Sequence, residues 1–159
     1  MSAEFLDSNV LVYLFDETDP AKRATARGLV ERGLESGEGC ISFQVVQETL
    51  HVVIRKLGAS PDDARRLLES VLAPLWRVLP SADLYRRGIE IQARYRLSFF
   101  DALIVAAALE AGCTRLWSED LQDGQRFDRL TVRNPFATLP AKPSPKAAKS
   151  SAGSPRRRR

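Results

Sequence analysis

Residues 98–112, SFFDALIVAAALEAG, constrain the fold more than any other part of the chain. Eight consecutive apolar residues follow Asp101, and Gly112 is a typical helix end. Ser98 predicts where the helix begins, because Ser98 and Asp101 have the spacing of a capping box. A helix that is apolar on every side has to be buried, so other elements must cover it.

Short apolar strands alternate with helices along the rest of the chain. Strands are predicted to end at residue 6 and to cover residues 40–42, 76–79, 115–117 and 130–133. Helices are predicted over about 10–15, 20–36, 44–57, 60–72, 81–96 and 98–112. Parallel strands need crossover connections, so this alternation predicts an α/β fold with a parallel sheet and helices on both faces.

Two acidic positions directly follow predicted strands. In open parallel sheets, ligands bind beyond the carboxyl ends of the strands, which is where Asp7 and Asp120 are expected. Taken alone, Asp7 is equally well explained as a turn or helix-capping residue. Glu119 and Asp123 share the loop of Asp120, and spacing does not decide which of the three faces inward. We favour Asp120.

Two further acids lie on predicted helices. Glu48 has Val45 and Val52 as neighbours on its helix face, so it lies on or beside an apolar stripe. A buried carboxylate is costly unless something positive meets it. Asp101 fits a structural role as the acid of a capping box in the first helical turn. It also stands at the mouth of a buried helix, a place suited to a cation.

Together the four acids form a set of hard oxygen ligands. Such ligands suit Mg²⁺ or Mn²⁺, and the sequence offers no Cys or His cluster that would favour zinc. A cation of this kind can activate water and stabilise charge on a phosphodiester. The sequence therefore predicts that Asp7, Glu48, Asp101 and Asp120 are both the catalytic residues and the metal ligands.

Other motifs give little support to other chemistries. Cys40 and Cys113 lie far apart without a CxxC motif, so neither a zinc site nor a disulfide framework is predicted. His51, the only histidine, follows Glu48 in an E-x-x-H spacing, but di-iron bundles need that motif twice. The sequence contains no G-x-S-x-G or P-loop motif.

The charge is divided unevenly along the chain. Residues 1–136 hold 17 basic and 20 acidic residues, whereas residues 137–159 hold seven basic residues and no acid. We predict one folded domain over 1–136 and a disordered basic tail over 137–159, because the tail has little to bury. The apolar N-terminus lacks a basic n-region, and no apolar run approaches the length of about 20 residues that crosses a bilayer. We expect a soluble cytoplasmic protein.

Four segments resemble those of PIN-domain proteins, and specifically of the VapC toxins of bacterial toxin–antitoxin pairs. The segments are FLDSNVLVY at 5–13, ISFQVVQE at 41–48, SFFDALIVAAALEAG at 98–112 and RLWSEDLQDG at 115–124. They follow the family's order and spacing across about 1–136. The four together are fairly specific, whereas no single one is.

The resemblance implies a three-layer α/β/α sandwich and Mg²⁺- or Mn²⁺-dependent endonucleolytic cleavage of RNA. It also implies a homodimer and inhibition by an antitoxin protein. The family's acids fall on Asp7, Glu48, Asp101 and Asp120, and its polar supporting positions fall on Asn9 and Ser118. Because the family often has Asn or Asp at the fourth position, Asp123 is a further supporting residue that could replace or assist Asp120.

Substrate contacts are left open. Candidate cations for RNA are Arg65, Arg66, Arg86, Arg87, Arg94 and Arg96, although these residues can equally cover exposed helix faces. The basic tail could add affinity that falls with salt. Two alternatives to the toxin stay open: a housekeeping RNA-processing nuclease of the PIN type, and a non-catalytic PIN-like module that binds RNA or protein.

Overall fold

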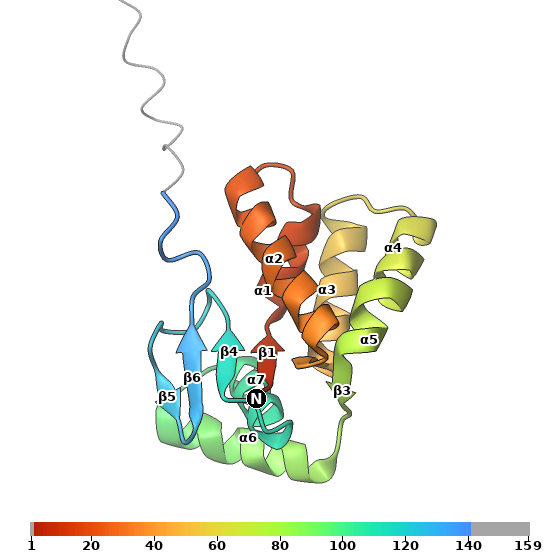
Figure 1. Cartoon of the computed structure of the whole chain (residues 1–159). Coiled ribbons are helices and arrows are strands. Elements are labelled where there is room, and N and C mark those ends of the chain that lie inside the picture. Colours follow the sequence, from red (N-terminus) through yellow and green to blue (C-terminus); the bar gives the residue numbers. More distant parts are fainter. Residues whose placement is uncertain (1, 141–159) are drawn as a thin grey trace, which may run out of the picture.

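The computed structural model describes residues 2–140. Six strands form one sheet in the order β3-β2-β1-β4-β6-β5 (Figure 1). The strands are β1 (Glu4–Leu6), β2 (Gly39–Ser42), β3 (Trp76–Val78), β4 (Arg115–Trp117), β5 (Arg126–Phe127) and β6 (Leu130–Arg133). The predicted basic tail lies outside the described residues from residue 141 onward, and the boundary at residue 136 stays a prediction.

The sheet is parallel except at one edge. β1 pairs in parallel with β2 and β4, β2 pairs with β3, and β4 pairs with β6. β5 pairs antiparallel with β6, and sequence analysis did not predict it. A strand of two residues is too short to show an alternating pattern. The hairpin that joins β5 to β6 turns through Asp128, which has a positive φ of 54°.

Helical segments connect the strands. They are α1 (Ser8–Val12), the 3₁₀ turn η1 (Tyr13–Phe15), α2 (Pro20–Ser36), α3 (Phe43–Arg55), α4 (Pro61–Leu67), the π-helical turn η2 (Leu68–Leu72), α5 (Ala73–Leu75), α6 (Ala82–Tyr95) and α7 (Phe99–Glu110). The predicted helix over 60–72 therefore continues to Leu75. Pro74 lacks an N–H and crowds the carbonyl four residues earlier, and the wider turn just before it relieves that clash.

Cap hydrogen bonds confirm four of the predicted helix starts, whereas the helix predicted to begin at about residue 10 begins at Ser8. Asp19 accepts from the backbone of Lys22, and Ser60, Ser81 and Ser98 each accept from the backbone N–H three residues later. Gly37 ends α2 in the left-handed conformation at φ 70°, which a residue with a Cβ rarely adopts. These local signals fix the lengths of the connecting helices.

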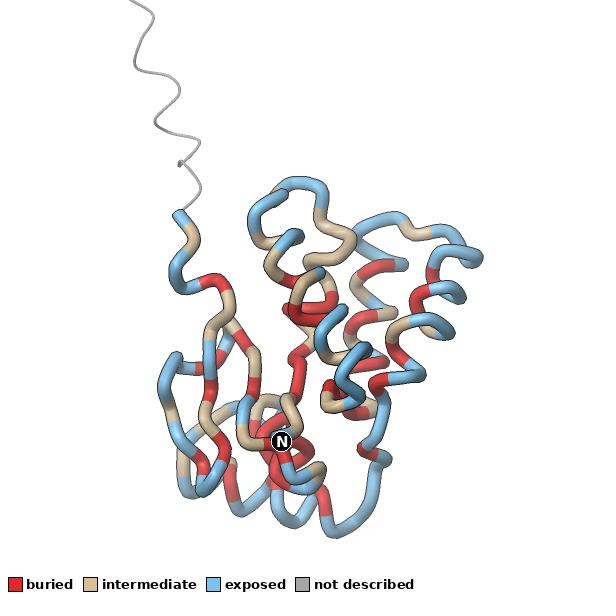
Figure 2. The backbone as a smooth tube through the Cα atoms, in the orientation of Figure 1, coloured by how far each residue is buried: buried red, intermediate tan, exposed pale blue. Residues whose placement is uncertain are grey.

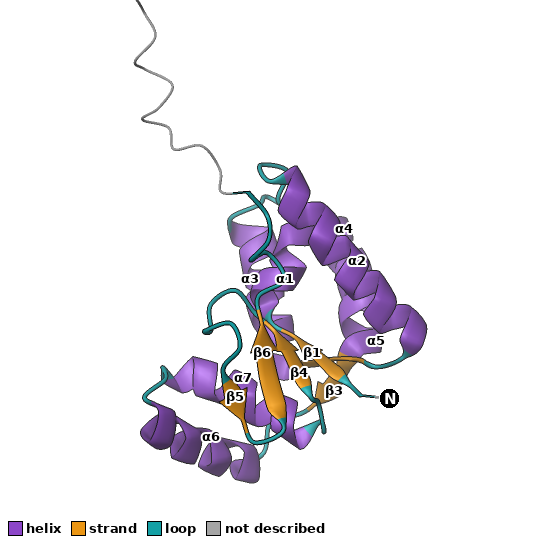
Figure 3. Ribbon diagram, turned by 60° about the vertical axis from the view of Figure 1, so that its left-hand side comes forward, coloured by secondary structure: helices purple, strands orange, loops and turns teal. Residues whose placement is uncertain are grey.

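The sheet is covered on both faces. α6 and α7 lie on one side of it, and α2 and α5 lie on the other (Figure 3). Successive side chains of a strand point to opposite faces of the sheet. Both Phe5 and Leu6 of β1 are buried, as are all four residues of β2, so helices cover the sheet on both faces. The predicted three-layer α/β/α sandwich is confirmed.

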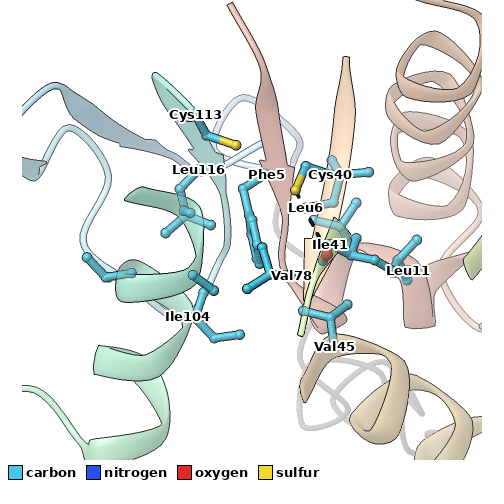
Figure 4. Packing of buried hydrophobic residues seen from close by; sticks show 14 of the residues in the cluster. Phe5, Leu6, Leu11, Cys40, Ile41, Val45, Val78, Ile104, Cys113 and Leu116 are labelled. Carbon is cyan, nitrogen blue, oxygen red and sulfur yellow. Dashed lines mark hydrogen bonds between the residues drawn. The ribbon is translucent and has the colours of Figure 1, made fainter. Parts of the chain in front are cut away.

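The core follows from the apolar helix α7. Its residues Ala102 to Leu109 are all buried, as their composition predicts. Ile104 of α7 packs with Phe5 of β1 and Leu116 of β4 in one cluster (Figure 4). The buried backbone runs through the central strands and the helix faces that meet them (Figure 2). No helix in residues 2–140 combines the length and apolarity that membrane crossing requires.

The close contact of α2 with β2 leads to a first prediction. A Cβ at Gly39 would come within 2.7 Å of the Gly33 Cα and 2.8 Å of a Leu75 methyl carbon. We expect Gly39→Ala to lower the unfolding free energy by about 1–3 kcal/mol through overpacking, as measured by urea denaturation. Gly28→Ala is the control, since a Cβ there meets nothing within 4 Å and should stabilise by about 0.4–1 kcal/mol. Equal stabilities of the two variants would contradict the packing.

Candidate active site

Asp7 lies at the carboxyl end of β1, where its carboxylate caps α1. The side chain is only 4% exposed. It accepts hydrogen bonds from the Ser8 backbone N–H at 2.7 Å and from the Ser118 hydroxyl at 2.7 Å, with the Asn9 amide at 3.3 Å. The backbone N–H of Asp7 donates to the carbonyl of Trp117 in β4, which fixes the residue between two strands.

Burial raises the pKa of Asp7 from 3.8 to about 7. Hydrogen bonds from Ser118 and Ser8 act in the opposite direction, and the nearby charges of Glu48 and Asp120 raise the pKa further. Within residues 2–140, none of the ion pairs involves Asp7, Glu48, Asp101 or Asp120. The donors on Asp7 are neutral groups, so its negative charge is hydrogen-bonded but not neutralised.

Glu48 is held beside Asp7 by two neutral donors. The Ser8 hydroxyl donates to Glu48 Oε2 at 2.7 Å, and the Gln44 amide donates to Oε1 at 2.9 Å from one helical turn earlier in α3. The same amide nitrogen lies 3.1 Å from the carbonyl of Phe100, at the start of α7. Gln44 therefore ties α3 to α7 at the edge of the acidic cluster.

Asn9 connects Asp7 to the loop after β4. Its amide lies 3.1 Å from Asp120 Oδ2 and 3.3 Å from the Ser118 hydroxyl, in addition to its contact with Asp7. The Ser118 hydroxyl also accepts from the backbone N–H of Asp120 at 3.2 Å. Asn9 and Ser118, both predicted as supporting residues, thus link two of the four acids.

The other two acids of this loop have different partners. Glu119 accepts from the Tyr13 hydroxyl at 2.6 Å and pairs with Lys22 at 2.9 Å. Asp123 accepts from the backbone N–H of Asn134 at 2.9 Å, which pins the loop to the chain after β6. Among Glu119, Asp120 and Asp123, Asp120 is therefore the acid whose carboxylate accepts from the Asn9 amide that also contacts Asp7.

Asp101 lies at the first turn of α7, one residue after the carbonyl that Gln44 contacts. Its backbone N–H donates to the cap hydroxyl of Ser98 at 3.1 Å, and its side chain is half-buried. The structure brings Asp7, Glu48 and Asp120 into one hydrogen-bonded network, whereas Asp101 borders it. As they lie in this structure, no three or more His, Cys, Asp or Glu side chains of residues 2–140 form a group that could hold a metal ion.

Two residues of the network had no predicted role. The Ser8 hydroxyl donates to Glu48, and the Ser8 backbone N–H donates to Asp7. The Gln44 amide donates to Glu48 and orients it. The four-residue spacing of Gln44 and Glu48 could have indicated their contact, because such residues share a helix face. The contact between Ser8 and Glu48 joins residues 40 apart in sequence, so no local pattern reports it.

The arginines predicted for RNA contact are exposed, and three of the six pair with acids on their own helices. Arg65 pairs with Asp62, Arg66 with Asp63, and Arg86 with Asp83, each three residues earlier. Exposed pairs of this kind contribute little free energy. Within the described residues, Arg87, Arg94 and Arg96 take part in no ion pair, so acids balance only half of these candidate cations.

Comparison with known proteins identifies the family. The family model described as PIN domain matches residues 5–131, which run from within β1 to the start of β6 and include all four acids. The chain belongs to the PIN-domain family. The resemblance seen in the four sequence segments is therefore confirmed.

Solved structures share the PIN fold at low sequence identity. VapC20 from Mycobacterium tuberculosis, described as a sarcin–ricin loop cleaving toxin, is 24% identical, with a TM-score of 0.55 over 73% of this chain and 88% of that chain. A toxin–antitoxin complex from Klebsiella pneumoniae is 22% identical, with a TM-score of 0.61 over 85% and 98%. VapBC2 from Rickettsia felis, bound to a promoter DNA fragment, is 17% identical, with a TM-score of 0.61 over 83% and 98%. No curated protein matches the chain.

The burial of Asp7 in this PIN domain predicts how stability depends on pH. The folded state binds a proton at Asp7 more tightly than the unfolded chain does, because its pKa is raised from 3.8 to about 7. The unfolding free energy should therefore fall as pH rises from about 4 to about 7, by on the order of 4 kcal/mol in the absence of divalent metal.

The corresponding experiment compares the wild type with Asp7→Asn in EDTA by thermal denaturation between pH 5 and pH 8. Because asparagine does not ionise, we expect the wild type to lose stability relative to the variant as pH rises. A stability difference that stays constant across this range would contradict an unneutralised, buried carboxylate at Asp7.

Proposed function

We propose that this PIN domain is a metal-dependent endoribonuclease and the toxin of a toxin–antitoxin pair. The observation that carries the proposal is the buried carboxylate of Asp7, with Glu48 and Asp120 beside it and neutral hydrogen-bond donors around it. This arrangement gathers negative charge at the carboxyl edge of the sheet, where ligands of parallel sheets bind.

Helix capping alone does not explain this cluster. Ser or Asn at position 7 would also cap a helix, without the cost of burying a charge. The side chains of Ser8, Asn9 and Gln44 instead donate hydrogen bonds that hold these carboxylates close to one another. An arrangement that opposes folding yet is held by specific hydrogen bonds is typical of a functional site.

The donor set fits a hard divalent cation. Asp7, Glu48, Asp101 and Asp120 offer carboxylate oxygens, the ligands that Mg²⁺ and Mn²⁺ prefer, and no lysine or arginine within residues 2–140 forms an ion pair with them. We infer that Asp7, Glu48 and Asp120 hold the cation with Asp101 at the border of the site. When bound, the cation would lower the pKa of a water and stabilise charge on a phosphodiester.

The protein's own residues position the reacting groups. Ser8 and Gln44 fix both oxygens of Glu48, and Ser118 fixes one oxygen of Asp7. Asn9 holds Asp120 against Asp7 through one amide group. Carboxylates held in this way lose little freedom when substrate arrives, and that preorganisation favours the transition state.

The toxin role and its partners are part of the proposal. The Klebsiella structure is a toxin–antitoxin complex, and the Rickettsia structure is VapBC2 bound to promoter DNA. By analogy, we infer an antitoxin protein that covers the acidic site, and a homodimer. The expectation of a cytoplasmic location stays a prediction.

Cleavage of RNA is the direct test of the proposal. Purified protein freed of antitoxin is incubated with total RNA in Mg²⁺ or Mn²⁺ and, as a blank, in EDTA. We expect metal-dependent cuts that leave 5′-phosphate and 3′-hydroxyl ends. Asp7→Asn, Asp101→Asn and Asp120→Asn should each lower the rate by at least about 100-fold, because a buried or metal-facing charge is lost.

Asp123→Asn is the matched control for Asp120→Asn. Asn keeps the oxygen that accepts from the Asn134 backbone, so this variant should cut RNA at close to the wild-type rate. Loss of activity in Asp123→Asn with full activity in Asp120→Asn would reassign the fourth acid. A folded wild type that cuts no RNA with either metal, and binds neither metal, would support the non-catalytic alternative.

The basic tail gives a separate prediction about RNA affinity. Leu139 packs against the core, so the deletion is made after Pro140 and removes residues 141–159 with their seven basic residues. We expect this deletion to weaken RNA binding at low salt and to flatten the dependence of affinity on salt concentration, because fewer counterions are released. Filter binding between 50 and 300 mM salt measures both. An unchanged salt dependence would show that the tail does not contact RNA.

A further inference from the structure

Lys22, in the first turns of α2, lies where four separate segments of the chain meet. Its ammonium group lies 2.9 Å from Glu119 Oε2 and donates to the Tyr13 hydroxyl at 3.0 Å. That hydroxyl donates to the other oxygen of Glu119 at 2.6 Å. The ring of Phe136, after β6, meets the ring of Tyr13 edge-on, and Lys22 lies 5.2 Å from the Phe136 centroid. We refer to Tyr13, Lys22, Glu119 and Phe136 as the lysine cluster.

The ion pair of the lysine cluster is the best shielded one within residues 2–140. The side chains of Lys22 and Glu119 are 28% and 22% exposed, whereas each of the other pairs has a side chain that is at least 47% exposed. A shielded pair that shares a further hydrogen-bond partner is held more firmly than a pair on the open surface. The carboxylate of Glu119 is therefore fixed in one direction.

That direction leads away from the acidic cluster. Ser118 and Asp120, the two neighbours of Glu119 in sequence, bond to Asp7 at 2.7 Å and to the Asn9 amide at 3.1 Å. The backbone N–H of Glu119 lies 3.4 Å from Asn9 Oδ1, so the turn itself stays beside the acidic cluster. Only the side chain of the middle residue points to the lysine cluster.

Folding alone gives no reason for an acid at position 119. The ring contact of Tyr13 with Phe136, at 4.8 Å between centroids, already joins η1 to the segment after β6. Replacing a shielded ion pair by uncharged side chains of similar volume often leaves stability unchanged. A carboxylate here has to be neutralised, and Lys22 supplies the charge that does so.

A carboxylate released at position 119 would disturb the candidate cation site. Consecutive Cα atoms lie about 3.8 Å apart, so a free Glu119 side chain would start close to that of Asp120. It would compete with Asp120 for the same cation and would repel the phosphate of a nucleic acid. The orientation of Glu119 therefore affects the chemistry of the site.

We propose that Lys22 is a positioning residue, which holds Glu119 out of the cation site and leaves Asp120 as the ligand from this loop. The inference rests on the proposed metal-dependent ribonuclease function and deepens it, because it explains how the fourth acid is selected. Lys22 acts through Glu119 and touches neither cation nor substrate. Tyr13 shares this role through its hydroxyl, and Phe136 covers the ammonium group.

Mn²⁺ titration and RNA cleavage by Lys22→Met test the inference. Methionine keeps most of the side-chain length and removes the charge, which frees Glu119. We expect Mn²⁺ to bind about 2- to 10-fold more tightly, because one more carboxylate reaches the cation. The kcat for RNA cleavage should fall at least about 10-fold, because that carboxylate takes a position that water or phosphate needs.

A second substitution should restore both values. Lys22→Met/Glu119→Gln has no carboxylate to release, so its Mn²⁺ affinity and kcat should return to within about threefold of the wild type. The measurements are made at about 300 mM salt, which screens charges that do not touch the cation. Tyr13→Phe keeps the ring contact and removes one bond to Glu119, so it should shift both values in the same direction as Lys22→Met but by less. It also provides the test if Lys22→Met does not fold.

Arg115→Met is the matched control. Arg115 of β4 pairs with Glu4 at 3.1 Å, and Glu4 is the first residue of β1. Asp7 follows the last residue of that strand, about 10 Å further along. Removing this pair deletes a comparable ion pair at the other end of the same strands, so Mn²⁺ affinity and kcat should equal those of the wild type.

Three results would overturn the inference while the wild type still cuts RNA. Weaker Mn²⁺ binding in Lys22→Met that Glu119→Gln does not restore would make the lysine cluster a structural tie. A raised KM for RNA with unchanged Mn²⁺ affinity would make Lys22 a phosphate contact. Unchanged values in both Lys22→Met and Tyr13→Phe would leave the cluster without a role in the site. A folded wild type that neither binds Mn²⁺ nor cuts RNA would reject the ribonuclease proposal and this inference with it.

Discussion

The burial of one carboxylate, that of Asp7, is the constraint on which the rest of the site depends. The order of the strands places β1 between β2 and β4, so the chain segments that follow these two strands flank Asp7. The helix after β2 brings Glu48, and the loop after β4 brings Ser118 and Asp120. The buried helix α7 starts beside them with Asp101. A parallel sheet thus collects acids from four separate regions of sequence at one edge.

The chain treats two neighbouring acids in opposite ways. Glu119 is neutralised by Lys22 and bonded to Tyr13, and Lys22 also lies over the rings of Tyr13 and Phe136, at 4.8 and 5.2 Å. Its hydrogen bonds to Glu119 and Tyr13 raise the pKa of Lys22, and burial together with Glu119 raises that of Tyr13, so both side chains stay protonated at neutral pH. The carboxylate of Asp120, the next residue, accepts from the neutral amide of Asn9 and takes part in none of the ion pairs within residues 2–140. Pairing one acid and leaving its neighbour without a cationic partner keeps negative charge where the proposed metal needs it.

Sequence alone predicted the class of fold and the helix caps, because both have local patterns, whereas the four acids stay predicted site residues. Ser98 with Asp101, Asp19 with Pro20, and the apolar run of α7 are short-range signals that the structure confirms. The two-residue strand β5 and the π-helical turn before Pro74 were missed, since both arise from tertiary packing. The hydrogen-bond partners of Glu119 and Asp123 could not be predicted from the sequence either. Those contacts join residues that lie far apart in sequence or fall within one ambiguous loop, and only the folded chain separates Asp120 from its neighbours.

The central claim is that the acids around Asp7 form a cation site, and direct metal binding tests it most simply. Isothermal titration of the purified, antitoxin-free protein with Mn²⁺ at pH 7.5 gives the affinity and stoichiometry without any reaction. We predict saturable binding to the wild type, a partial release of protons because the raised pKa leaves a fraction of Asp7 protonated at this pH, and a loss of at least about ten-fold in affinity for Asp7→Asn. Binding of equal strength in the wild type and Asp7→Asn, or none in a folded wild type, would contradict the account.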